Sequence, residues 1–167
     1  TVTDGDGGSA TGTTTVTITN VAPSVGPVVH DGPQPETATV SFSVVASDVA
    51  GGNDPLTYAW TFGDGATATG SSTSHPYADD GTWTVTVMVS DGDGGSTASS
   101  ASVVVTNTAP TLTALVGDTA GLVGQTLTFA VAGTDPAGAA DPLTATWDFG
   151  DGGAASGASA AHPWLSP

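Results

Sequence analysis

Apolar and polar residues alternate along most of the chain with a period of two, and no segment shows the apolar period of an amphipathic helix. The clearest alternation lies at 40–44, 58–62 and 83–89, where Val, Phe, Tyr or Trp occupies every second position. Because successive side chains of a strand point to opposite faces, these runs predict strands with one buried and one exposed face. Gly-Asp-Gly and Asp-Gly clusters between the runs supply the residues that tight turns need. The pattern therefore predicts an all-β fold, a β-sandwich.

The alternating pattern occurs twice. An offset of 87 residues aligns positions 1–80 with 88–167 without a gap, and 34 of these 80 pairs are identical. The identical stretches include Asp-Gly-Asp-Gly-Gly at 4–8 and 91–95, Asp-Pro-Leu-Thr at 54–57 and 141–144, and His-Pro at 75–76 and 162–163. A period of this length exceeds a solenoid repeat and suits a small complete domain. The chain is therefore predicted to be a tandem array.

The offset also predicts where the domains begin and end. Residues 1–20 correspond to the C-terminal strands of a preceding repeat, and residues 21–107 make one complete domain. Residues 108–167 correspond to the N-terminal part of a further domain, which stops before its last strands. We interpret the chain as an excerpt from a longer array. The alternative is head-to-tail self-association, in which residues 1–20 of one chain supply the missing strands of another.

The charge of the chain is one-sided. It has 15 Asp, one Glu and no Lys or Arg, which gives a formal net charge of −16. Nucleic acid and anionic membranes are excluded as partners because no side chain can neutralise a phosphate. Divalent cations are the natural counter-ions. No Cys is present, so disulfides contribute nothing, and no apolar run approaches the length of a membrane span.

The letters Asp148-Phe149-Gly150 raise the question of phosphoryl transfer, because the same triplet holds magnesium in kinases. That chemistry needs Lys and Arg side chains around the phosphates, and the chain has neither. In the first copy Thr61 replaces Asp148, so the recurring motif is Trp-x-Phe-Gly-Asp-Gly, a strand followed by a turn. No nucleophile and base recur at a suitable spacing. The sequence predicts a protein that is not an enzyme.

Trp-x-Phe-Gly-Asp-Gly at 60–65 is followed by His-Pro-Tyr at 75–77, Gly-Thr-Trp-Thr-Val at 81–85 and Asp-Gly-Asp-Gly-Gly at 91–95. Found together at this spacing, these motifs resemble the PKD (polycystic kidney disease) domain family. Trp83 and Trp164 stand where the family more often has Tyr. The resemblance covers the whole chain and implies immunoglobulin-like β-sandwiches of an extracellular protein, secreted or on the cell surface. Bacterial and archaeal members accompany secreted proteases, collagenases and chitinases, or form stalks of surface proteins.

Individual aromatic and histidine residues are expected to be structural. Trp60 and Trp147 have apolar partners two positions away, which predicts a place between the two sheets. The alternative is a surface Trp that stacks on a sugar. His75 and His162 each precede Pro, which favours a hydrogen-bonded loop histidine over a catalytic base. Gly-Asp-Gly at 63–65 is interpreted as a turn whose carboxylate accepts backbone N–H bonds.

The acidic loops do not match the EF-hand, because Gly95 stands at the fifth position counted from Asp91 and no Glu closes the loop. Some collagenase PKD modules bind calcium, however, and the resemblance implies this ion at the similar positions. In the first complete domain these positions are Asn20, Asp48, Asp54 and Asp91. In the second copy they are Asn107, Asp135 and Asp141, with the last ligand beyond the end of the sequence. The alternative is that these aspartates only form turns.

Two classes of function are consistent with these features. In the first, the chain is a non-catalytic spacer or adhesive stalk of a secreted or cell-surface protein. In the second, it is an accessory module that presents polysaccharide or protein to a neighbouring hydrolase. Substrate modules usually expose a flat row of aromatic side chains, whereas the aromatics here occupy core-facing positions. The sequence therefore favours the spacer, with neighbouring repeats as its main partners.

Overall fold

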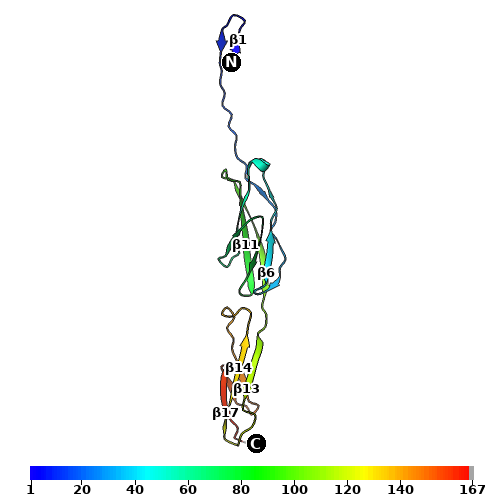
Figure 1. Cartoon of the computed structure of the whole chain (residues 1–167), viewed down its shortest axis with the longest axis vertical. Helices are drawn as coiled ribbons and strands as arrows, with labels where there is room; N and C mark the ends of the chain where they lie inside the picture. The colour runs from blue at the N-terminus through cyan, green and yellow to red at the C-terminus, as the bar shows by residue number, and fades with distance from the viewer. Residues whose placement is uncertain (166–167) are drawn as a thin grey trace.

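The computed structural model describes residues 1–165 and is almost entirely β-structure (Figure 1). The molecule is elongated. Its long axis runs from a small hairpin through an extended segment and a complete sandwich to a second, smaller group of strands. We call residues 1–20 the N-terminal segment, 21–107 the middle domain and 108–165 the C-terminal region. Within these described residues the helical structure is one 3₁₀ turn, η1 (Gly51–Asn53), and no helix is suited to crossing a lipid bilayer. The predicted all-β fold is confirmed.

The N-terminal segment begins with a short hairpin. β1 (Val2–Thr3) pairs antiparallel with β2 (Ser9–Ala10). Residues 11–20 belong to no strand, and all side chains of the segment are exposed. Its interpretation as the end of a preceding repeat stays a prediction.

The middle domain consists of two main sheets. The larger sheet has the order β5-β12-β11-β8-β9, with β5 parallel to β12 and the other pairs antiparallel. Its strands are β5 (Gln34–Pro35), β8 (Thr57–Thr61), β9 (Thr67–Thr69), β11 (Gly81–Ser90) and β12 (Ser96–Thr106). The smaller sheet contains β4 (Val29–His30), β6 (Thr39–Ser43) and β10 (Ser72–Pro76) in the order β10-β6-β4. β3 (Ser24–Val25) and β7 (Ala46–Ser47) pair antiparallel and form a separate two-stranded sheet.

The core of the middle domain is built from the alternating positions. Trp60 on β8 is 1% exposed and its ring lies 6.2 Å from that of Phe42 on β6, so it fills the space between the sheets. Its indole N–H donates to the Gly70 carbonyl at 2.8 Å, which satisfies the one polar atom of the ring. The other buried apolar residues are Val28, Val40, Val44, Phe62, Tyr77, Val85, Val87, Val89, Val103 and Val105. The predicted core position is confirmed for Trp60, whereas Trp147 in the second copy is only half-buried.

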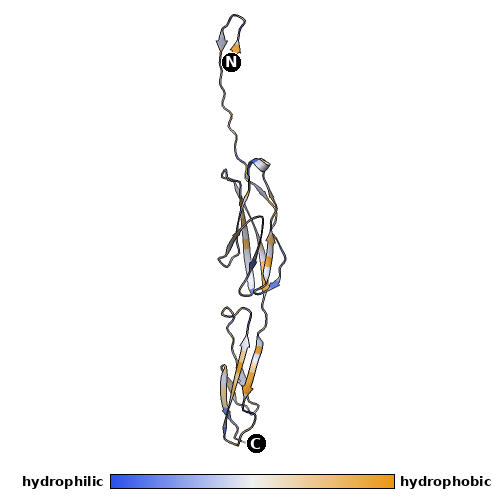
Figure 2. Cartoon of the chain, viewed as in Figure 1, coloured by the Kyte–Doolittle hydropathy of each residue, from blue (hydrophilic) through white to orange (hydrophobic). Residues whose placement is uncertain are grey.

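The C-terminal region repeats part of this arrangement. One sheet contains β13 (Thr111–Gly117), β14 (Thr126–Thr134) and β17 (Ser159–Pro163), and a hairpin contains β15 (Thr146–Asp148) and β16 (Ala154–Ser156). Phe129 and Trp147 pack with centroids 6.0 Å apart, as their equivalents do in the middle domain. Figure 2 shows hydrophobic residues along β13, and one of them, Leu115, is 64% exposed. The packing of the first copy is therefore repeated without its closure.

Candidate metal centre

The turn after β11 is built around the carboxylate of Asp91. Its Oδ1 accepts backbone N–H bonds from Asp93 and Gly95, both at 2.9 Å, and Asp91 is 2% exposed. Asp4 holds the equivalent turn in the N-terminal hairpin, where the Gly8 amide donates to its Oδ1 at 2.6 Å. The Asp-Gly-Asp-Gly-Gly motif therefore folds locally, as the turn interpretation predicts. The turn accounts for the hydrogen bonds of Asp91 Oδ1, but not for the position of its Oδ2.

The second oxygen of Asp91 faces the chain that enters the domain. The side-chain amide of Asn20 donates to Asp91 Oδ2 at 2.7 Å. Gly95 allows this approach: a Cβ at that position would collide with the Asp91 carboxylate and lie 2.8 Å from the Ala22 Cα. The absence of a side chain at residue 95 thus lets the segment that leads into the domain lie against the turn. The two predicted ligands Asn20 and Asp91 meet.

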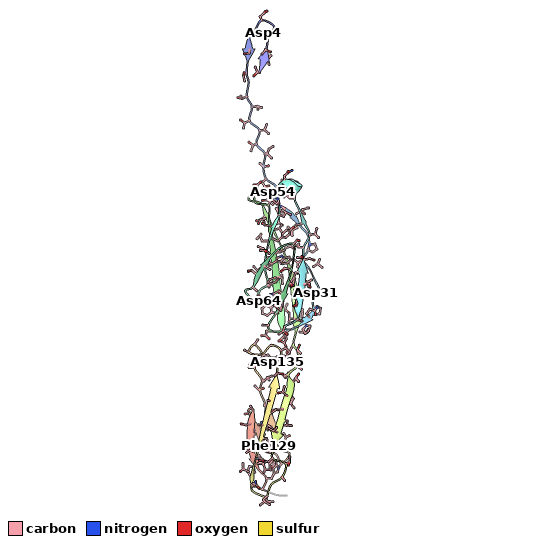
Figure 3. All side chains as sticks on the ribbon, viewed as in Figure 1. Asp4, Asp31, Asp54, Asp64, Phe129 and Asp135 are labelled. Carbon is pink, nitrogen blue, oxygen red and sulfur yellow. The ribbon has the colours of Figure 1, made fainter. Side chains whose placement is uncertain are left out.

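The loop between β7 and β8 supplies two further carboxylates. Asp48 accepts the Ala50 amide on Oδ1 at 2.8 Å, whereas its Oδ2 is buried and has no hydrogen-bond partner within residues 1–165. Asp54 follows η1 and is 6% exposed. One oxygen from each of Asp48, Asp54 and Asp91 lies within 4.8 Å of the others. We call Asn20 and these three aspartates the entrance site, because Asp54 lies at the end of the middle domain where the N-terminal segment joins it (Figure 3).

The electrostatics of the entrance site are unfavourable without a cation. Burial raises the pKa of Asp54 above its ordinary 3.8, and the negative charges of Asp91, Asp93 and Asp48 raise it further. The pKa of Asp91 lies below 3.8, because the hydrogen bond from Asn20 stabilises its carboxylate, with help from the amides of its own turn. The chain contains no Lys or Arg that could neutralise these groups. Three acidic side chains are thus held together without a Lys or Arg partner.

The second copy repeats part of this geometry. Asp135 accepts the Ala137 amide on Oδ1 at 2.9 Å, and its Oδ2 is buried without a partner among the described residues, as for Asp48. Asp135 lies at the end of the C-terminal region that faces the middle domain (Figure 3). Asp141 is half-buried and Asn107 is exposed. Within residues 1–165, Asp135 and Asp141 belong to no group of three neighbouring acidic side chains, so the geometry of the entrance site is not repeated in full.

Sequence reasoning missed another acidic group in the middle domain. Carboxylate oxygens of Glu36, Asp79 and Asp80 also lie within 4.8 Å of one another. These residues come from two loops far apart in the sequence and match none of the predicted motifs. The one signal available in the sequence was that Glu36 is the sole glutamate of the chain.

The two recurring histidines are structural. His75 Nε2 lies 2.6 Å from Asp64 Oδ2, and its ring stacks on Phe62 with centroids 4.3 Å apart. His162 repeats this arrangement with Asp151 at 2.8 Å and Phe149 at 4.3 Å. Each Asp belongs to the Gly-Asp-Gly turn, so the histidine ties the turn to the neighbouring strand. The predicted hydrogen bond of each histidine is confirmed, but the prediction of a loop position was wrong: His75 lies in β10 and His162 in β17, where each pairs with a neighbouring strand.

The Asp-Phe-Gly triplet is also part of a strand and its turn. Asp148 ends β15, and its Oδ1 accepts the Gly150 amide at 2.9 Å. The Gly-Asp-Gly turn follows: Asp151 Oδ1 accepts the Gly153 amide at 2.9 Å, and in the first copy the equivalent Asp64 Oδ1 accepts the Ala66 amide at 3.0 Å. The turn interpretation of the Gly-Asp-Gly motif is confirmed.

Comparison with known proteins establishes the family. The model of the PKD domain matches residues 20–106 and 107–167, two consecutive segments that together cover most of the chain. The chain therefore belongs to the PKD domain family and contains tandem PKD repeats with an immunoglobulin-like sandwich fold. Members of this family are in general non-catalytic accessory modules of larger proteins. No curated protein is similar enough to count as a match.

Three solved structures illustrate the similarity. The PKD1 domain of Epp from Vibrio anguillarum is 25% identical, with a TM-score of 0.43, over 52% of this chain and 96% of that domain. The PKD1 domain of the metalloprotease PrtV from Vibrio cholerae is 24% identical, with a TM-score of 0.42, over 51% of this chain and 98% of that domain. A structure from a study of β-sandwich carbohydrate-binding modules is 22% identical, with a TM-score of 0.46, over 68% of this chain and 56% of that structure.

Proposed function

We propose that the chain is a non-catalytic spacer of a secreted or cell-surface protein, in which calcium stiffens the junction between successive PKD repeats. The observation that carries this proposal is the entrance site, where Asn20 from the extended segment that leads into the domain meets Asp91 at 2.7 Å beside two further carboxylates. A cation held there contacts both the domain and the chain that enters it. Such a contact limits the angles that two neighbouring repeats can adopt.

The residues of the entrance site fit calcium. Calcium takes six to eight oxygen ligands at about 2.3–2.6 Å, so two oxygens on one ion lie at most about 5 Å apart. Carboxylate oxygens within 4.8 Å of one another meet this condition. The buried Oδ2 of Asp48 is free to serve as a ligand, and no cationic side chain of the chain competes for it. Magnesium demands a tighter octahedral shell and is expected to substitute poorly.

The burial of the aromatic side chains supports a spacer over a substrate-binding module. No Phe, Tyr or Trp among residues 1–165 is exposed, so this part of the chain offers no flat aromatic surface for a polysaccharide. A pull-down with insoluble chitin, cellulose and collagen tests the point directly. We expect the chain to remain in the supernatant. Retention on one of these polymers would instead favour the accessory module of a hydrolase.

Thermal melting with and without calcium tests the entrance site. A ligand that binds only the folded state stabilises it by RT ln(1 + [L]/Kd), about 2.7 kcal/mol at one hundred times Kd. We expect calcium to raise the Tm of the middle domain and EDTA to reverse the increase. Asp48→Ala should reduce this increment by the part that the entrance site contributes. Asp31→Ala is the matched control: it removes the 2.8 Å bond from the Ser41 amide and lowers the Tm, yet leaves the calcium increment unchanged.

A Tm that is the same in calcium and in EDTA would contradict the proposal, as would equal loss of the calcium increment in both variants.

A further inference from the structure

We propose that Glu36, Asp79 and Asp80 form a second calcium site, at the end of the middle domain from which the chain leaves for the next repeat. We call it the exit site. It shares no residue with the entrance site and does not depend on it. The family resemblance implied nothing at these positions.

Glu36 is the unusual member of the group. It is 2% exposed, and its backbone N–H donates to the Thr106 carbonyl at 3.0 Å, which fixes it beside the end of β12. Its Oε1 accepts the Thr108 amide at 2.8 Å. Its Oε2 is buried and has no hydrogen-bond partner within residues 1–165. A buried, unpaired carboxylate oxygen is costly and points to a ligand that completes it.

The other two carboxylates come from the turn between β10 and β11. The Asp80 amide donates to Asp79 Oδ1 at 3.0 Å, so this turn is locally ordered. Asp79 is half-buried and Asp80 is exposed. One oxygen from each lies within 4.8 Å of a Glu36 oxygen. Three carboxylates at this distance repel one another unless a cation lies among them.

The chemistry of the group favours calcium. All three ligands are carboxylates, which suit a hard cation, and no His or Cys is among them. The exposed position of Asp80 leaves room for water to complete a coordination shell of six to eight oxygens. Because the chain has no Lys or Arg, no internal cation can take this place.

The exit site also explains why the middle domain differs from the next copy. Val123 occupies the position equivalent to Glu36, and Ser166 and Pro167 those equivalent to the two aspartates. The group therefore belongs to the middle domain alone. Since Glu36 also holds the Thr108 amide, a cation on its free oxygen would fix the first residue of the C-terminal region. The middle domain would then have one cation at each of its two junctions.

NMR of the Thr108 amide in the whole 167-residue chain tests the exit site. EDTA-treated protein is titrated with CaCl₂ to about 10 mM, above the affinity range of extracellular calcium modules. We expect the Thr108 cross-peak to shift with saturation. The shift should be lost in Glu36→Gln and in Asp80→Asn. Asp80 is exposed, so its variant is expected to fold even if Glu36→Gln does not.

Two control variants separate this site from the others. Asp135→Asn and Asp48→Asn should keep the Thr108 shift, because their carboxylates belong to the C-terminal region and to the entrance site. An unchanged Thr108 cross-peak at saturating calcium would overturn the exit site. So would a shift that survives Asp80→Asn or disappears in Asp135→Asn. Failure of the entrance site would appear separately, as a Tm of the Asp48 variant that responds to calcium like the wild type.

Discussion

The middle domain and the C-terminal region carry nearly the same motifs but differ in how far they bury them. Phe42 and Trp60 are 2% and 1% exposed, whereas their equivalents Phe129 and Trp147 are only half-buried, although each pair of rings packs at a similar distance. The difference lies in the β11–β12 hairpin. It contributes five buried valines to the middle domain, and residues 108–165 contain no counterpart of it.

This comparison shows that local aromatic packing and closure of the sandwich are separate steps. The stacking of the histidine on the Phe ring occurs in both copies with centroids 4.3 Å apart. This stacking needs only the strand that ends before the Phe, the Gly-Asp-Gly turn and the strand that carries the histidine. Removal of the core from water requires the last hairpin, because that hairpin covers the open side of the aromatic cluster.

The largest expected effect is that of Trp60→Ala. The substitution leaves a cavity between the sheets and should lower the free energy of unfolding of the middle domain by about 3–5 kcal/mol. Trp147→Ala in the half-open copy should cost clearly less, since its ring is already partly in contact with water. Urea denaturation followed by circular dichroism measures both. Equal losses would show that closure by the hairpin adds little to the core.

The open side of the C-terminal region predicts a difference in protease resistance. In dilute solution, the C-terminal region of the 167-residue chain should be cleaved about tenfold or more faster than the middle domain. Head-to-tail association, with residues 1–20 of one molecule against the C-terminal region of another, would protect it as concentration rises. Deletion of residues 1–20 should then remove this protection. Limited proteolysis and light scattering test both points, and a strictly monomeric chain with a protected C-terminal region would contradict them.

Asp54→Asn should separate stability from calcium binding. The raised pKa of Asp54 means that its ionised form destabilises the folded state at neutral pH when no cation is bound. Removal of this charge is therefore expected to raise the Tm in EDTA and to reduce the increase that calcium produces. Differential scanning calorimetry in both buffers measures the two effects. A variant with a lower Tm in EDTA would show that the carboxylate serves as a structural hydrogen-bond acceptor instead.

The smallest effect concerns the two His–Asp pairs in acid. Burial acts to raise the pKa of Asp64, but the Ala66 amide and His75 hold it below 3.8; His162 and the Gly153 amide lower the pKa of Asp151. A depressed carboxyl pKa contributes stability above the unfolded value of 3.8, and this contribution is lost as pH falls through the folded value. We expect a modest fall in Tm below about pH 3.8. In Asp64→Asn this fall should be weaker for the middle domain, while the C-terminal region responds as before.

Much of the fold could be predicted from the sequence because the determining interactions are local or periodic. The alternation at 58–62 placed Trp60 in the core, and Gly-Asp-Gly at 63–65 predicted the turn held by Asp64. The strand at 96–106 was less visible, because Ala and Ser occupy most of its positions and only Val103 and Val105 are buried. Small residues carry little hydrophobic pattern even where they pair along a whole hairpin.

The sequence by itself determined the strand period, the repeat, the turns and the absence of any internal cation for the acidic groups. It also pointed to Asn20, Asp48, Asp54 and Asp91, although only as positions similar to those of a family. The tertiary structure decided which carboxylates meet and which oxygens have no hydrogen-bond partner among residues 1–165, as for Asp48 Oδ2 and Glu36 Oε2. Turn carboxylates bond to amides two to four residues away, so sequence spacing records them. Contacts between Glu36 and Asp79 depend on how two sheets close over one core, and no local pattern encodes that distance.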